Sequence, residues 1–173
     1  MPLTPQTGRQ GGEFFSRYLD TNGDGTGTKN AIGNFAGAVT DFFISPAART
    51  QLVIARLIIQ VSDVGPIVPA GYGNLAALVN GISLLHFHDT TLFADYMDGL
   101  PVTTNGNWAR TSYDVDYQLA GGIGENYIET RWSFNRASDG IVLHQEDSLV
   151  MRLNDNFTGI ESQTFCAQGE LYE

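Results

Sequence analysis

The stretch from Gln51 to Val61, QLVIARLIIQV, is the most apolar part of the chain and decides which fold to expect. Taken with a period of two residues, one face carries Val53, Ala55, Leu57, Ile59 and Val61, and the other carries Leu52, Ile54, Arg56, Ile58 and Gln60. β-Branched residues dominate, and no capping or charge pattern supports a helix. The stretch therefore predicts a central strand with one wholly apolar face.

Shorter segments of the same kind follow on both sides, separated by turns rich in Gly, Asn and Asp. The predicted strands cover residues 39–44, 82–89, 91–97, 102–104, 113–117, 126–135, 141–144, 149–153 and 160–167. Strands spaced by roughly 8–12 residues, with at most one short helix at 73–79, are typical of an all-β sandwich. The prediction is a β-sandwich with jelly-roll topology.

The domain organisation is expected to be simple. A chain of 173 residues can bury a sufficient core as one domain, and no linker or internal repeat divides it. The first twelve residues, MPLTPQTGRQGG, are polar, rich in Pro and Gly and without periodicity. We expect an extended N-terminal arm over residues 1–18 and a single sandwich domain over 19–173.

Charge and cysteine content restrict the class of partner. The formal net charge is −10, which repels phosphate backbones and anionic lipid, so neither nucleic acid nor membrane is an expected partner. Eight of the nine basic residues are arginine, which is favoured at protein interfaces. One cysteine, no apolar signal-peptide segment and no 18-residue apolar run predict a protein made in a cytoplasm.

Two segments contain candidate metal ligands, although no metal or cofactor is the leading expectation. Asp20, Asn22 and Asp24 match the first half of a calcium loop, but position twelve is Ala31 instead of the usual Glu, which favours an ordinary turn. His86 and His88 lie two residues apart on one strand, as in the H-x-H motif of cupins. The expected Glu does not follow, which favours histidines with a structural role.

The enzymatic hypothesis is weak. Asp114 and Asp116 share a strand face and could act as a glycosidase pair, but the same pattern is typical of a solvated strand face. The Gly121–Gly124 segment, GGIG, follows a strand but opens no helix, so it does not predict a phosphate-binding loop. The absence of other catalytic motifs predicts a protein that is not an enzyme.

Several segments resemble small structural proteins of tailed phages. They are TNGDGTGTKNAIGNF, ARTQLVIARLIIQVSDVGP, the YGN and NGI tripeptides, NWARTSYDVDY and MRLNDNFTGIESQTFCAQGEL, which together fall in most of residues 20–170. The resemblance implies a virion component. It implies in particular a capsid cement or decoration protein that binds the major capsid protein and copies of itself as a homotrimer.

Aromatic residues in the turn-rich parts are the candidate interface anchors, because aromatic side chains dominate binding hot spots. They are Phe14, Phe15, Tyr18, Tyr72 and Trp108. The alternatives are a neck or tail adaptor of the same virion, a cupin-like metal enzyme using His86 and His88, and a carbohydrate-binding sandwich with calcium at Asp20 to Asp24.

Overall fold

The computed structural model describes residues 12–29, 40–63, 82–96, 114–119, 126–133, 140–153 and 162–173, which form ten strands and no helix. The strands are β1 (Glu13–Tyr18), β2 (Thr40–Ile44), β3 (Gln51–Asp63), β4 (Ile82–His88), β5 (Thr91–Asp95), β6 (Asp114–Leu119), β7 (Asn126–Ser133), β8 (Ile141–Leu143), β9 (Asp147–Leu153) and β10 (Ser162–Tyr172). The all-β prediction is confirmed. The helix predicted at 73–79 and the strand at 102–104 lie outside the described residues. Within the described part, no helix has the length and apolar character that crossing a membrane requires.

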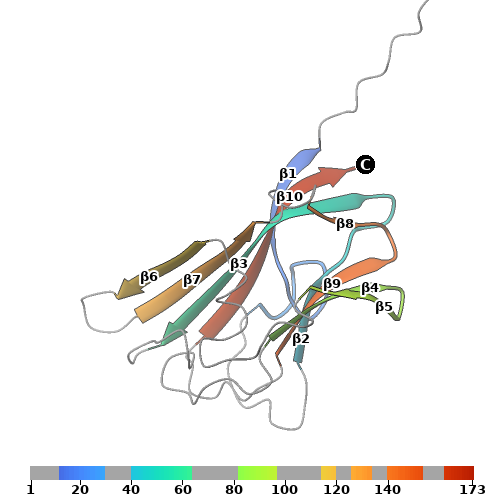
Figure 1. The fold of residues 1–173 in the computed structure, drawn as a ribbon. Helices are drawn as coiled ribbons and strands as arrows, with labels where there is room; N and C mark the ends of the chain where they lie inside the picture. Colours follow the sequence, from blue (N-terminus) through green and yellow to red (C-terminus); the bar gives the residue numbers. More distant parts are fainter. Residues whose placement is uncertain are drawn as a thin grey trace, which may run out of the picture.

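The strands form two antiparallel sheets. The larger has the order β1-β10-β3-β7-β6, with β8 also paired to β3, and the smaller has the order β2-β9-β4-β5. Figure 1 shows the larger sheet as a long twisted layer and the smaller one grouped beside β8 and β10. The sandwich-like arrangement predicted from strand spacing is confirmed.

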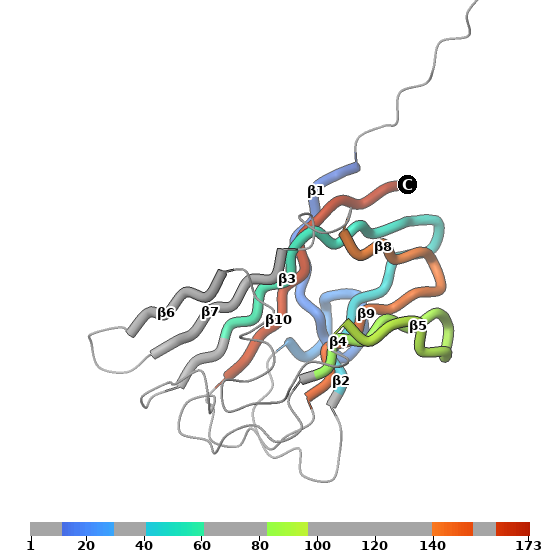
Figure 2. Tube along the Cα trace, in the orientation of Figure 1, coloured from blue at the N-terminus to red at the C-terminus, as the bar shows by residue number. Residues whose placement is uncertain are grey.

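The pairing is nested along the chain. β1 pairs with β10, β2 with β9, β3 with β8, and β4 with β5. The β6–β7 hairpin comes between β5 and β8 in sequence and adds to the larger sheet through β7, beside β3. The tube in Figure 2 shows the first and last described strands side by side as a consequence.

The central strand β3 contains an irregularity that its sequence pattern does not reveal. Gln168 is opposite Arg56 and Gly169 is opposite Ile54, so Ala55 is an extra residue in β3. Such a bulge moves the side chains beyond it to the other face. The buried positions are accordingly Leu52, Ile54, Leu57 and Ile59, and the prediction of one apolar face starting at Val53 was wrong for its first half.

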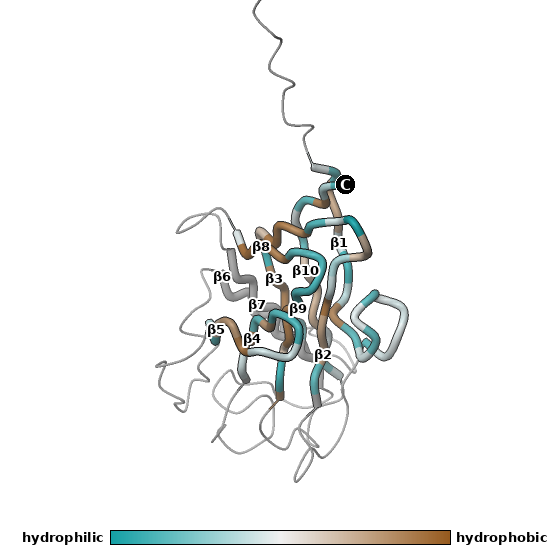
Figure 3. The backbone as a smooth tube through the Cα atoms, turned by 90° about the vertical axis from the view of Figure 1, so that its right-hand side faces the viewer, coloured by the Kyte–Doolittle hydropathy of each residue, from teal (hydrophilic) through white to brown (hydrophobic). Residues whose placement is uncertain are grey.

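The core lies between the two sheets. The rings of Phe42 on β2 and Phe165 on β10 are both buried, and their centroids are 5.6 Å apart. Figure 3 shows how hydrophobic and hydrophilic residues alternate along the strands. The other fully buried large side chains are Leu19, Ile44, Leu52, Ile54, Leu57 and Ile59. Burial of this size supplies most of the stability of such a domain.

The N-terminal boundary differs from the expected one. Glu13 to Tyr18, which we expected to belong to an arm, form β1 and pair with β10 from Leu171 back to Cys166. Phe15 on this strand is buried in the core. The predicted boundary at residue 18 was therefore wrong, and residues 1–11 of the predicted arm lie outside the described part.

An ion pair joins β2 and β9 at the edge of the smaller sheet. The Arg152 guanidinium donates from Nε to Asp41 Oδ1 and from a terminal nitrogen to Oδ2, both at 2.7 Å. We expect Asp41→Asn to lower the free energy of unfolding by about 0.5–1 kcal/mol, because the pair is bidentate but one-third exposed. Urea unfolding checks the value. The loss should shrink in about 1 M salt, whereas a salt-independent loss would contradict an ionic origin.

Candidate functional site

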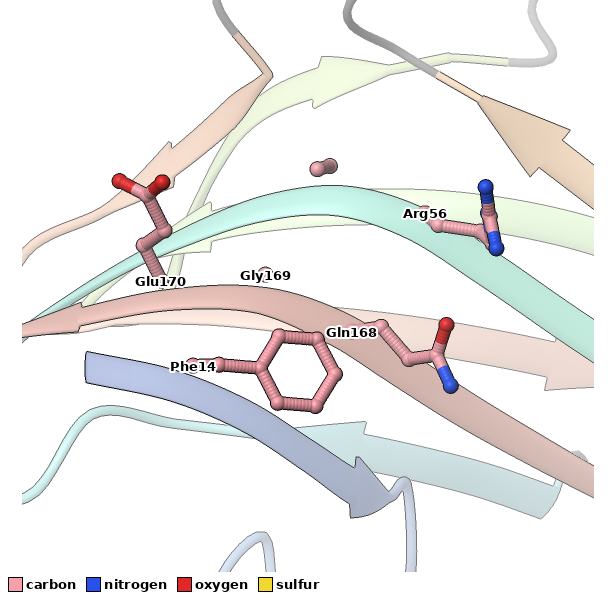
Figure 4. A pocket seen from close by; sticks show the side chains of 6 residues that line it. Phe14, Arg56, Gln168, Gly169 and Glu170 are labelled. Carbon is pink, nitrogen blue, oxygen red and sulfur yellow. The ribbon is translucent and has the colours of Figure 1, made fainter. Parts of the chain in front are cut away.

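An open depression lies on the outer face of the larger sheet, beside the bulge. It is lined by Phe14 of β1, by Ala55 and Arg56 of β3, and by Gln168, Gly169 and Glu170 of β10. Figure 4 shows the Phe14 ring beside the Gly169 stretch of β10, with Arg56 towards one end and Glu170 towards the other. The depression exists because the bulge places two residues with little or no side chain, Ala55 and Gly169, next to each other.

The exposed aromatic and large aliphatic side chains of the described part lie on β1, on β5 or directly after β5. Phe14 is 70% exposed on β1, and Phe93 is 72% exposed on β5. Tyr18, Leu92 and Tyr96 are the others, at the end of β1, on β5 and directly after β5. In the described strand orders, β1 and β5 each end a sheet. Exposed apolar side chains therefore coincide with two sheet edges.

The structure separates the predicted interface anchors. Phe14 and Phe15 are adjacent in a strand and so point to opposite faces, and Phe15 is the buried one. Tyr18 is 43% exposed, with the Lys29 ammonium 4.8 Å from its ring centroid. Tyr72 and Trp108 lie outside the described residues. Sequence reasoning missed Phe93, which is the extra residue of a bulge in β5, because His86 is opposite Ala94 and Phe87 is opposite Leu92. Its ring lies against that of the buried His86, with the centroids 5.0 Å apart.

A second candidate site lies where the β4–β5 and β8–β9 turns meet. Asp147, the first residue of β9, is directly opposite His88, the last residue of β4. The Asp89 N–H donates to the Glu146 carbonyl at 2.8 Å, which ties the two turns together. The Asp147 N–H donates to the His144 carbonyl at 2.9 Å and closes the β8–β9 turn.

All three histidines of the chain lie around the buried Asp147 carboxylate. His88 Nδ1 is 2.8 Å from Oδ1, while His86 Nε2 and His144 Nδ1 are each 3.4 Å from Oδ2. Oδ2 also accepts the backbone N–H of His144 at 2.8 Å. His86 is buried, and its other nitrogen, Nδ1, is 3.1 Å from the Tyr96 hydroxyl, whereas His88 and His144 are exposed.

These contacts keep Asp147 ionised. Burial alone would raise the pKa of the carboxyl, but the hydrogen bonds from the His144 N–H, His88 and His86 outweigh it, and the pKa is lowered to about 2. The hydrogen bond between Asp147 and His88 also raises the pKa of the His88 imidazole above its ordinary value. Burial and, secondarily, the Asp147 charge raise the pKa of Tyr96. Because an ionised carboxylate only accepts hydrogen bonds, neutral His88 carries its proton on Nδ1 and leaves Nε2 as an acceptor.

The two histidines of the H-x-H motif thus have different surroundings. Both contact Asp147, but both nitrogens of His86 are already in polar contacts. Among the residues that the structure describes, the side chains that bring three potential metal-ligating atoms within 4.8 Å of one another are His88, Asp89 and Glu146. His86 is not among them. Sequence reasoning missed Glu146 and Asp147 because they are about 60 residues from the motif.

The calcium candidates stabilise a turn. Asp20 is fully buried, and its carboxylate accepts the backbone N–H groups of Asn22, Gly23 and Gly27. Asp24 is exposed and accepts both the N–H and the hydroxyl of Thr26, which lowers the pKa of its carboxyl. The carboxylates of Asp20 and Asp24 therefore have partners within the loop itself, as the turn interpretation requires.

The carboxylate pair considered for acid–base chemistry lies on β6, at the far end of the larger sheet. In the register of β6 and β7, Asp114 is opposite Arg131 and Asp116 is opposite Glu129. Asp116 thus faces a second acidic residue across the strand pair, and β7 separates β6 from β3, the nearest strand that lines the depression.

Comparison with known proteins found no match for this chain among protein-family models, curated proteins or solved structures.

Proposed function

We propose that this chain is a non-enzymatic structural protein of a virion, a capsid cement or decoration protein that binds the major capsid protein and copies of itself. The observation that carries the proposal is the placement of the exposed aromatic side chains on β1 and β5, the end strands of the two described sheets. The resemblance of the sequence to phage structural proteins supports a location in a virion. The exposed aromatic side chains at the sheet edges support binding to other protein chains.

Sheet edges of this kind favour contact with another chain. An end strand offers unpaired N–H and C=O groups, and monomeric proteins usually protect such an edge with charge, proline or a covering loop. Here β1 instead exposes Phe14, and β5 exposes the two consecutive residues Leu92 and Phe93. Strand addition at an edge combined with an aromatic anchor is a recurrent mode of protein recognition. Binding, in preference to catalysis, is what this arrangement supports.

The nested strand pairing supports the finer assignment of the fold. Pairing of first with last, second with second-last and so on yields the orders β1-β10-β3-β8 and β2-β9-β4-β5. Two four-stranded sheets built in this way form a jelly roll, with β6 and β7 as an inserted hairpin. Jelly-roll domains are common in viral capsids, which fits a virion location after synthesis in the host cytoplasm.

The two edges take different partners in this proposal. We assign β1 and the depression beside it to the major capsid protein, because the exposed Phe14 ring lines that depression. We assign β5 to a neighbouring copy within a homotrimer. A standard interface buries roughly 1,600 Å², and repetition around the shell adds avidity.

Light scattering and sedimentation with capsid shells test the proposal. Wild-type protein should form a trimer and sediment with shells assembled from the major capsid protein of the same genome. Phe14→Ser should weaken shell binding at least about tenfold, as expected for a hot-spot aromatic, and should leave the trimer intact. Phe93→Ser should instead dissociate the trimer.

The matched control for Phe14 is Glu13→Gln, at an exposed neighbouring position on β1, which should bind like wild type. Circular dichroism confirms folding of each variant. Protein that stays monomeric and does not bind shells would overturn the proposal. A larger ring without shell binding would indicate the neck or tail adaptor instead.

A further inference from the structure

We propose that the joined β4–β5 and β8–β9 turns form a binding site for a divalent transition-metal ion. The ligands are His88 Nε2 and the carboxylates of Asp89 and Glu146, and Asp147 orients His88 from the interior. The site adjoins β5, because His88 is opposite Thr91 and Asp89 lies in the β4–β5 turn. Its test uses zinc alone, so its outcome is distinguishable from that of the shell-binding and trimer experiments.

The arrangement of the ligand atoms carries the proposal. His88, Asp89 and Glu146 each offer one atom, and these atoms lie within 4.8 Å of one another. His88 Nε2 is 3.8 Å from Glu146 Oε2. Two ligands bound to a tetrahedral zinc ion at about 2.1 Å are roughly 3.4 Å apart. All three side chains are exposed, so they can close the remaining gap by small rotations.

Asp147 provides a second and independent feature of a metal-binding histidine. A histidine that binds a metal through one nitrogen commonly donates the other N–H to a carboxylate, which fixes the ring and its tautomer. His88 Nδ1 makes this contact with Asp147 Oδ1 at 2.8 Å. Asp147 is itself buried and held by the backbone N–H of His144. Nε2 of His88 is thereby directed towards Glu146.

Backbone and charge also fit a bound cation. The hydrogen bond from the Asp89 N–H to the Glu146 carbonyl brings the two acidic residues together from different hairpins. In the described part of the chain, no Lys or Arg is within ion-pair distance of either carboxylate. The carboxyl groups of Asp89, Glu146 and Asp147 lie around one imidazole, an arrangement that a divalent cation would stabilise. One nitrogen and two carboxylate oxygens suit Zn²⁺, Co²⁺ or Mn²⁺ better than a thiolate-preferring ion.

Calorimetric titration of the chelator-treated full chain with zinc chloride at about pH 7.5 tests the site. We expect one Zn²⁺ per chain. Glu146→Gln and Asp89→Gly should each weaken binding at least about tenfold, and His88→Gln should abolish it. Glycine suits position 89 because Asp89 has a φ of 53°.

His144→Gln is the matched control, since His144 is an exposed histidine that contacts the same Asp147 but is not a proposed ligand. It should keep the zinc affinity within about twofold, whereas removal of a ligand or its supporting group costs about 10–100-fold. An ultraviolet circular dichroism spectrum of every variant confirms folding. Absence of zinc binding by folded wild-type protein would overturn the proposal. So would binding that depends on His144 and not on Glu146.

Discussion

Gly169→Ala should lower the free energy of unfolding by about 3 kcal/mol, at the upper end of the usual cost of overpacking. A Cβ on Gly169 would fall on the Val53 carbonyl oxygen, with the Val53 carbonyl carbon at 2.9 Å and the Ala55 nitrogen at 3.1 Å. These are backbone atoms of β3, so no side-chain rotation relieves the contact. The two central strands of the larger sheet would have to separate at the bulge.

Thermal and urea unfolding measure this loss, which corresponds to roughly 10 °C in the midpoint for a chain of this size. Gly27→Ala is the matched control. Its new methyl group would meet only the side-chain amide of the exposed Asn22, which can turn away, so we expect a loss of at most about 1 kcal/mol. Equal losses in the two variants would mean that the bulge is not the tight approach described above.

Asp147→Asn should lower the free energy of unfolding by about 2 kcal/mol near neutral pH. The folded carboxyl has a pKa of about 2 in place of 3.8, and each unit corresponds to about 1.4 kcal/mol. Because the folded pKa is lowered, this stability is present above about pH 4 and disappears as the pH falls towards 2. Asparagine has no charge to lose, so the variant lacks this dependence.

The raised pKa of His88 contributes with the opposite sign. Its share of the stability is present below the ordinary histidine pKa of 6.5 and is lost as the pH rises through the higher folded value. The advantage of wild type over Asp147→Asn should therefore be largest at about pH 5–6, smaller at pH 8 and absent near pH 2.

Urea unfolding at these three pH values, in chelator-containing buffer, measures the difference between wild type and Asp147→Asn. Glu146→Gln is the control, because that side chain is 61% exposed and its loss should change stability by less than about 0.5 kcal/mol. A pH-independent difference between wild type and Asp147→Asn would contradict the ionised, hydrogen-bonded carboxylate.

The sequence predicts strands better than it predicts which face of a strand is buried. The residues of β3 were recognised as a strand because β-branched residues repeat there. The face assignment failed at Ala55, since a bulge depends on the register with β10 and not on the strand itself. Gly169 in the partner strand is the one local sign of it, because glycine inside a strand often marks a bulge.

The sites show the same limit. Sequence spacing singled out His86 and His88, but Asp147 becomes their neighbour only through the pairing of β4 with β9. Likewise, the pair Phe14 and Phe15 requires one aromatic inside and one outside, and only the docking of β1 on β10 decides which is which. Local sequence patterns predict whether a segment forms a strand, whereas the residues that meet in a site depend on the pairing of segments far apart in the sequence.

The nested pairing also determines the order in which the molecule can be built. Tyr18 pairs with Cys166, nearly 150 positions later, so the larger sheet cannot be completed until β10 has left the ribosome. Loops of this length have an entropic cost that local contacts do not repay early, and topologies dominated by distant pairs fold on the millisecond-to-second scale. Until β10 arrives, β1 and β3 both lack their shared neighbour. Synthesis of β10, Ser162–Tyr172, is therefore the step that joins β1 to the rest of the larger sheet.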